Sequence, residues 1–152
     1  MAKNRTYKEK YDNYEEMIVE KTINKIMLDG KKSLARNIFN AAVEHVQDAT
    51  GEDGLTMFRK AVENLKPELE VKSKRIGGAN YQVPIQVTPK RKNSLAIRWL
   101  VEYARNRNDE HDMERKLAKE IIEASKKEGG AYRRKEEIHK MAEANKAFAY
   151  FG

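Results

Sequence analysis

The stretch LEVKSKRIGGANYQVPIQVTP, residues 69–89, is the one part of this chain whose pattern does not predict a helix. Residues 70–76 and 81–87 each alternate apolar or aromatic side chains with polar ones, which is the period of a β-strand. Between them, Gly77, Gly78 and Asn80 are residue types that adopt the positive φ angles of a hairpin turn. The stretch therefore predicts a two-stranded β-hairpin, about 25 Å long at roughly 3.3 Å per residue.

The predicted hairpin needs support from elsewhere. Pro84 has no N–H group to donate to a neighbouring strand, so its strand must lie at an edge. A lone two-stranded ribbon consists only of edges and is marginally stable in water. We therefore expect the hairpin to pack against the rest of the chain or against a partner.

Positive charge is concentrated in and beside the hairpin. Residues 66–92 carry seven cations and two anions, which supplies five of the chain's seven net positive charges. In one interpretation the lysines only keep exposed strand edges from aggregating. The interpretation we favour is a basic arm that lies along phosphates, with glycines that let its backbone approach them closely. Tyr81 would then either stack on a base or pack against the core.

The remaining sequence predicts six helices, with the hairpin inserted between the third and the fourth. Apolar residues recur at helical spacing along each, and the second helix has Leu34 and Ala49 within its expected core stripe and Ser33 as its expected N-cap. Gly129 and Gly130 are expected to end the fifth helix. The fold class is thus mainly α, a single domain over residues 15–152 with a hairpin arm at about 69–89.

Residues 1–14 are polar, basic and rich in tyrosine, without apolar periodicity. They predict a mobile tail that orders on a partner, with Lys3 and Arg5 as candidate contacts, or an ordinary frayed terminus.

Composition narrows the class of function. The chain has 152 residues, with 31 Lys and Arg against 24 Asp and Glu, which favours a polyanionic partner, nucleic acid before an acidic membrane surface. It has no cysteine, and its three histidines are far apart, so no metal site is expected. It contains no nucleotide-binding loop or hydrolase motif. No run approaches the ~20 apolar residues of a membrane span. We expect a cytoplasmic binding protein, neither an enzyme nor a cofactor carrier.

The helix after the hairpin begins with Lys90, Arg91 and Lys92, which is the unfavourable sign for the helix dipole. A phosphate bound at that terminus would remove this cost. Further along the same helix, Arg98 and Arg105 either continue the basic strip or form ion pairs with Glu102 or Asp109.

RNA suits this layout better than duplex DNA, because folded RNA offers irregular phosphate surfaces to an arm, loops and helix starts together. The alternative is a sequence-specific DNA-binding regulator that reads bases through Arg36 and Asn37, after the short turn at residues 30–33.

Four runs of the sequence resemble the bacterial small-subunit ribosomal protein seven family. They are NKIMLDGKK at 24–32, LEVKSKRIGGANYQVP at 69–84, IRWL at 97–100 and MAEANKAFA at 141–149. The resemblance implies a helical body with an extended hairpin. It also implies binding to the 3′ major domain of 16S rRNA, nucleation of head assembly, a place near the exit-site tRNA and mRNA, and contacts with neighbouring ribosomal proteins of the head and platform. Some members of the family also repress translation of their own operon.

The resemblance also assigns roles to residues of this chain. Lys31 and Lys32 would form an rRNA-contacting turn, and the far end of the arm would point toward the tRNA exit site. The chain departs from the family in its last residues, Tyr150, Phe151 and Gly152, where many members have a basic, tryptophan-bearing end, and at Thr88, where many carry arginine. The candidate RNA-binding residues are Lys3, Arg5, Lys31, Lys32, Lys72, Lys74, Arg75, Gly77, Gly78, Lys90, Arg91, Lys92, Arg98 and Arg105.

Overall fold

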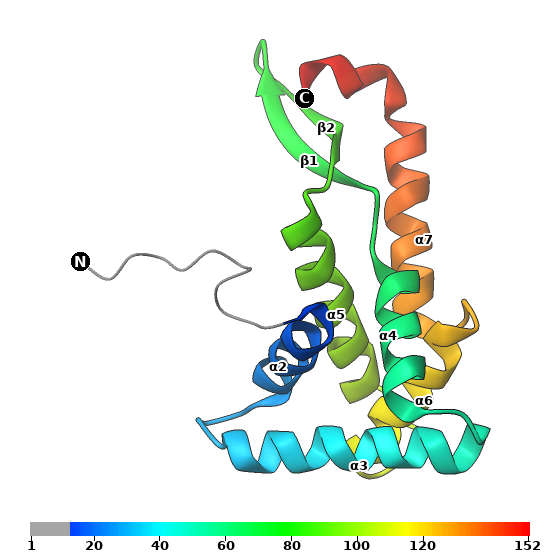
Figure 1. Ribbon diagram of the computed structural model, residues 1–152. Coiled ribbons are helices and arrows are strands. Elements are labelled where there is room, and N and C mark those ends of the chain that lie inside the picture. Colours follow the sequence, from blue (N-terminus) through cyan, green and yellow to red (C-terminus); the bar gives the residue numbers. More distant parts are fainter. Residues whose placement is uncertain (1–12) are drawn as a thin grey trace.

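The structure, a computed structural model, describes residues 13–152 and shows a helical body with a β-hairpin at one end (Figure 1). The elements are α2 (Tyr14–Ile26), α3 (Lys32–Thr50), α4 (Gly54–Leu65), β1 (Leu69–Ile76), β2 (Ala79–Gln86), α5 (Pro89–Arg105), α6 (Met113–Ser125), α7 (Gly129–Ala144) and a C-terminal 3₁₀ helix, η1 (Lys146–Phe151). The mainly α fold is confirmed, with the hairpin between the third and fourth predicted helices. Lys3 and Arg5 lie outside the described residues, whereas Tyr14, placed in the expected tail, is the first residue of α2.

Local side chains explain where two helices begin. The Asn13 side chain accepts a hydrogen bond of 2.8 Å from the Glu16 backbone N–H, and the Asp53 carboxylate accepts one of 3.0 Å from that of Thr56. Both contacts satisfy an N–H group that has no partner within its own helix.

Two of the predicted helix boundaries are wrong, one at a start and one at an end. Ser33 is not a cap, because α3 already begins at Lys32 and Lys31 precedes it without a side-chain hydrogen bond. Gly129 and Gly130 begin α7 instead of ending α6. The chain leaves α6 after Ser125 and turns through Lys127, at a φ of 59°, and Gly129, at a φ of 90°, so the glycine serves the connection into the next helix.

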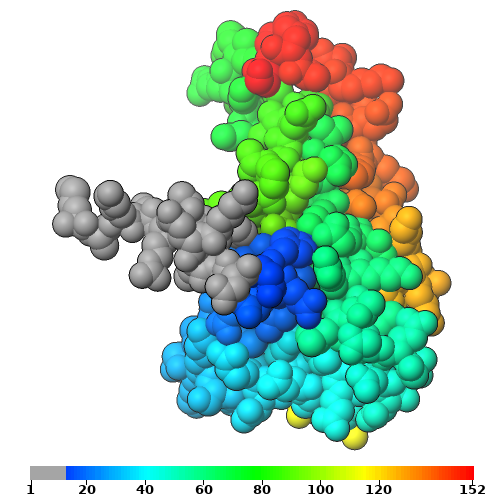
Figure 2. All heavy atoms as spheres, viewed as in Figure 1, coloured from blue at the N-terminus to red at the C-terminus, as the bar shows by residue number. Residues whose placement is uncertain are grey.

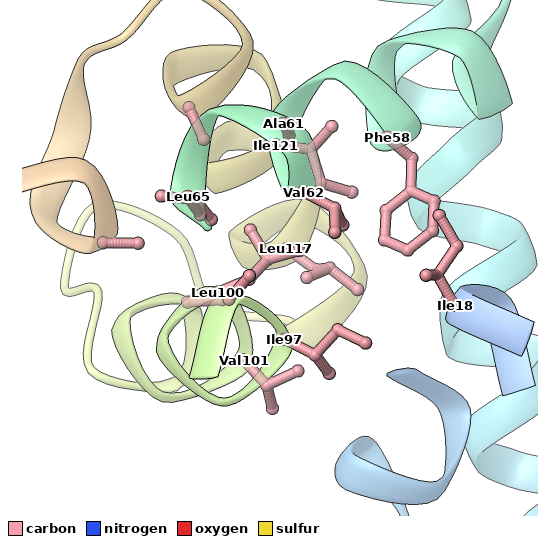
Figure 3. Close-up of a cluster of buried hydrophobic side chains, with 14 of the residues drawn as sticks. Ile18, Phe58, Ala61, Val62, Leu65, Ile97, Leu100, Val101, Leu117 and Ile121 are labelled. Atoms are coloured by element: carbon pink, nitrogen blue, oxygen red, sulfur yellow. The ribbon is translucent and has the colours of Figure 1, made fainter. Parts of the chain in front are cut away.

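The core lies where α4, α5 and α6 meet, with α2 and α3 closing one side (Figure 3). Phe39 of α3 and Phe58 of α4 pack edge to face, with ring centroids 5.0 Å apart. The prediction that Leu34 and Ala49 belong to the core is wrong: both are exposed, Leu34 by 55%. The buried stripe of α3 instead starts at Ala35, and one residue along a helix turns the side chain by about 100°.

The strands of the hairpin have eight residues each, and the turn between them is tighter than predicted. Ile76 pairs with Ala79, which leaves Gly77 and Gly78 as a two-residue turn at φ angles of 57° and 84°. Asn80 pairs with Arg75 inside the ladder, so the glycines alone supply the positive φ angles. The hairpin lies at the opposite end of the molecule from α3, with α7 packed beside β1 and η1 beside β2 (Figure 1). The expected support is therefore the C-terminal part of the chain.

Among residues 13–152, no helix has the length and apolar character needed to cross a membrane.

Candidate nucleic-acid interface

The cations of the hairpin lie on two faces. Side chains alternate along a strand, so Lys72 and Lys74 share one face of β1, and Arg75 lies on the other, opposite Asn80. Lys72 and Arg75 are exposed. Lys74 is partly buried, and its Nζ donates a hydrogen bond of 3.0 Å to the backbone carbonyl oxygen of Phe151. Lys72 and Arg75 therefore face solvent, whereas Lys74 is bonded within the fold.

Tyr81 packs against the C-terminal aromatic residues. Its ring centroid lies 5.1 Å from that of Phe148 and 5.8 Å from that of Phe151. Of the two roles considered for Tyr81, the structure favours packing over stacking on a base.

The tip of the hairpin is open. Gly77 and Gly78 are exposed, and a Cβ atom built on either would meet no heavy atom within 4 Å. Their positive φ angles, rather than crowding, require glycine here. The backbone of the tip is thus free to approach a ligand closely.

At the root of the hairpin, the first turn of α5 carries the exposed Lys90, followed by Arg91 and Lys92, which pair with carboxylates before and within β1. Arg91 Nε lies 2.7 Å from Glu70 Oε1, and Lys92 Nζ lies 2.8 Å from Glu68 Oε2. The hydrogen bond that Arg91 donates to Glu70 raises the pKa of Arg91, and the one that Lys92 donates to Glu68 lowers the pKa of Glu68. These carboxylates already offset part of the unfavourable charge at the helix start. Each pair has one exposed member, Arg91 in the first and Glu68 in the second, so water screens the two pairs and their contribution to stability is small.

The turn between α2 and α3 presents one of its two predicted lysines directly. Lys31 is exposed. Lys32 Nζ lies 3.0 Å from Glu20 Oε2, and Arg36 Nη2 lies 3.0 Å from Glu20 Oε1. These two cations lower the pKa of Glu20, with the Lys32 hydrogen bond as the largest cause. Since Arg36 is held by Glu20, nothing in this arrangement favours the alternative of base reading by Arg36 and Asn37.

Arg105 is part of the scaffold. Its Nη2 donates hydrogen bonds to the carbonyl oxygens of Lys25, at 3.0 Å, and Ile26, at 2.9 Å. These carbonyls lie at the C-terminal end of α2, where a cation and extra donors are favourable. Arg105 therefore joins α5 to α2 through these backbone carbonyl groups, rather than through Glu102 or Asp109.

Arg98 lies instead in a groove between α2 and α5 that sequence reasoning missed. The groove, of about 290 Å³, is lined by Lys21, Asn24, Lys25, Ser94, Ile97 and Arg98. Three cations and two neutral polar groups thus face one space, and no carboxylate of residues 13–152 lines it. We name this the α2–α5 groove. Its size and charge suit phosphate groups of a nucleic-acid backbone.

The sequence held part of this signal. Lys21 and Lys25 are four residues apart, as are Ser94 and Arg98, so each pair lies on one side of its helix. What the sequence does not show is that α2 packs on α5 and brings the two pairs together.

A second groove lies around Arg107, and its lining combines four carboxylates with two arginines: Asp109, Glu120, Glu123 and Glu128 with Arg107 and Arg133. Arg107 Nη1 lies 2.7 Å from Glu120 Oε2 and 2.8 Å from Glu123 Oε2, and its Nη2 lies 2.8 Å from Asp109 Oδ2. Glu120 is 1% exposed, and its other oxygen accepts a hydrogen bond from the Ala131 backbone N–H. This network, which is buried at Glu120, links the connector after α5 to the start of α7.

Comparison with known proteins decides the family. The model of the family described as "Ribosomal protein S7p/S5e" matches residues 1–146. The chain belongs to this family. Its relatives include the proteins named "Small ribosomal subunit protein uS7" of Mycoplasmopsis synoviae and Acetivibrio thermocellus, each 53% identical over 138 residues. The protein of the same name from Carboxydothermus hydrogenoformans is 54% identical over 138 residues. Each alignment covers 91% of this chain and 88% of the relative.

Membership in the S7p/S5e family confirms several expectations from the sequence. The resemblance drawn from four short runs was correct, and the chain is a structural ribosomal protein rather than an enzyme. The expected location, the cytoplasmic ribosome, follows from the same membership. Binding of rRNA is general to the family.

Proposed function

We propose that this chain is a structural component of the small ribosomal subunit that binds the 3′ major domain of its rRNA through three cationic surfaces. These are the α2–α5 groove, the start of α5 and the exposed cations of the hairpin. The α2–α5 groove is the observation that carries the proposal, because it gathers Lys21, Lys25 and Arg98 without a lining carboxylate.

The finer parts of the function are proposals as well. We propose that the chain nucleates assembly of the subunit head and contacts neighbouring ribosomal proteins of the head and platform. The hairpin tip, with exposed Gly77 and Gly78, would then reach toward the exit-site tRNA and mRNA. The positions of the two surfaces support separate roles for them. The hairpin tip lies at one end of the molecule, and the α2–α5 groove lies away from it, where α2 packs beside the lower part of α5 (Figure 1). One surface can therefore hold rRNA while the other reaches outward.

A binding experiment tests the proposed function. The affinity of the full chain for a transcript of the 3′ major domain is measured over a series of salt concentrations, with equal-length duplex DNA as competitor. The expected result is tight, RNA-selective binding whose affinity falls steeply with salt, because each phosphate contact contributes about 0.7 to 0.9 to the logarithmic slope. Equal affinity for the transcript and the duplex would contradict the proposal.

A further inference from the structure

The C-terminal segment, defined as η1 with Gly152, lies against one face of the hairpin (Figure 2). Contacts come from both strands. The rings of Phe148 and Phe151 pack on Tyr81 of β2, and the Phe151 carbonyl oxygen accepts the hydrogen bond from Lys74 of β1. Lys74 and Tyr81 are directly opposite each other in the ladder, so a single cross-strand pair receives all three contacts.

An apolar layer separate from the main core accompanies these contacts. Val83 follows Tyr81 by two residues, so it lies on the same face of β2, and it is fully buried although it is not part of the main core cluster. The last residue also lies close to β2. A Cβ atom built on Gly152 would be 3.3 Å from Ile85 Cγ2 and 3.3 Å from the Pro84 carbonyl oxygen. The C-terminal segment thus covers a face of the hairpin that the main core does not reach.

The hairpin and the C-terminal segment stabilise each other. The only sheet in the described part of the chain has two strands, and an isolated two-stranded ribbon is marginally stable in water. Of the six residues of η1, none is buried, so the segment has no anchor in the main core. The family model matches residues 1–146, so Phe148 and Phe151 lie just outside that match.

We propose that the C-terminal segment is a positioning element, which holds the hairpin in the orientation that binds RNA. Phe148 and Phe151 are its positioning residues, acting through Tyr81 and Lys74. The inference rests on the proposed function, since it concerns how the hairpin is presented to rRNA. The opposite relationship, in which the segment competes with RNA for Lys74, is an outcome that the test below separates.

The first part of the test uses the free, full-length protein. Amide hydrogen exchange is measured over residues 70–86 in the wild type and in the double variant Phe148→Ala, Phe151→Ala. Loss of the two ring contacts to Tyr81 should speed exchange in the hairpin by about tenfold or more, whereas exchange in α4 stays unchanged. The control is Leu28→Ala, which removes a 65% exposed apolar side chain from the turn between α2 and α3, outside the hairpin and the C-terminal segment. Unchanged exchange in the hairpin of the double variant would overturn the proposal.

The second part measures binding of the same proteins to the transcript of the 3′ major domain. The double variant should bind about tenfold more weakly, by the same loss of two ring contacts. The variant Phe148→Tyr, Phe151→Tyr keeps both rings and should restore the affinity and the exchange rates. Faster exchange with equal or tighter binding would overturn the positioning role and show competition for Lys74. Failure of the wild type to bind would instead contradict the proposed function, and with it the inference.

Discussion

Arg91 Nε donates a hydrogen bond of 2.7 Å to Glu70 Oε1, which joins the first turn of α5 to the outgoing strand of the hairpin. The next residue repeats the connection, from Lys92 to Glu68. On the other side of the root, the Glu68 backbone N–H donates to His139 Nε2 of α7. The root of the hairpin is thus in contact with α7 and with α5, the helix that also carries Arg98 of the α2–α5 groove.

Removing the two carboxylates at the hairpin root should strengthen RNA binding. In the double variant Glu68→Gln, Glu70→Gln, Arg91 and Lys92 lose their partners and become available to phosphates. The logarithmic salt slope should become steeper by about one to two, and the affinity at low salt should rise. The control is Glu137→Gln, which removes an exposed carboxylate paired with Arg134 on α7. Weaker binding of the double variant would show that the pairs are needed to aim the hairpin.

Lys72 and Arg75 should contribute to rRNA binding, whereas Lys74 should contribute to the stability of the hairpin. In Lys72→Ala with Arg75→Ala, two exposed charges are removed, and the salt slope for rRNA binding should fall by about one to two. Lys74→Ala should leave the slope nearly unchanged and instead speed amide exchange in the hairpin, because its Nζ is bonded to the Phe151 carbonyl. A lower salt slope for Lys74→Ala and an unchanged slope for Lys72→Ala with Arg75→Ala would contradict these roles.

Arg107 should be essential for stability. Arg107→Ala leaves Glu120, which is 1% exposed, without the cation that neutralises it. Removing one partner of a buried ion pair costs about 3–5 kcal/mol of unfolding free energy. Urea denaturation measures the loss. The control is Arg115→Ala, whose side chain is exposed and lies 4.0 Å from Asp112, and which should cost less than about 1 kcal/mol. Equal, small losses in both variants would contradict the role of the network.

Stability should fall as the pH drops below about 6.5, the usual pKa of histidine. Burial lowers the pKa of His139, and the charge of Lys135 lowers it further, against the smaller opposing effects of Glu136 and Glu68. The unfolded chain therefore binds the proton first, and stability is lost between about pH 6.5 and the lower pKa of the folded state. Protonation also removes the Nε2 acceptor of the Glu68 N–H.

The melting temperature measured from pH 7.5 to pH 5.5 checks this expectation for His139. The variant His139→Gln keeps a polar side chain without the titration, so its melting temperature should vary less over the same range. If the wild type and the variant lose the same amount of stability, another group is responsible.

The parts of the fold that follow from local pattern could be predicted from the sequence. The strand alternation and the two adjacent glycines gave the hairpin, and Asp53 marked the start of α4. The errors arose where a residue type suits several positions. Gly129 fits the end of one helix and the start of the next, and Leu34 is apolar but lies about 100° from the stripe that faces the core. The role of a glycine at a helix boundary, or of an apolar residue on a helix, depends on how distant segments pack.

The same limit applies to the candidate interface. The pattern located the exposed cations Lys31, Lys72 and Arg75, but the partners of Lys74 and Arg105 come from residues more than 70 positions away. The α2–α5 groove likewise brings Lys21 and Arg98 together from two helices far apart in the sequence. Charge can be counted along a chain, but whether a cation faces a carboxylate, a carbonyl or solvent is decided by tertiary packing.

The most direct test of the central claim is the salt slope of rRNA binding for the triple variant Lys21→Ala, Lys25→Ala, Arg98→Ala. The comparison is with Lys60→Ala, Lys126→Ala, Lys140→Ala, which removes the same charge from exposed positions on α4, after α6 and on α7. If the α2–α5 groove holds phosphates, the slope of the first variant should fall by about two to three below that of the control, because each contact contributes about 0.7 to 0.9. Equal slopes in the two variants would show that the groove does not bind the rRNA backbone.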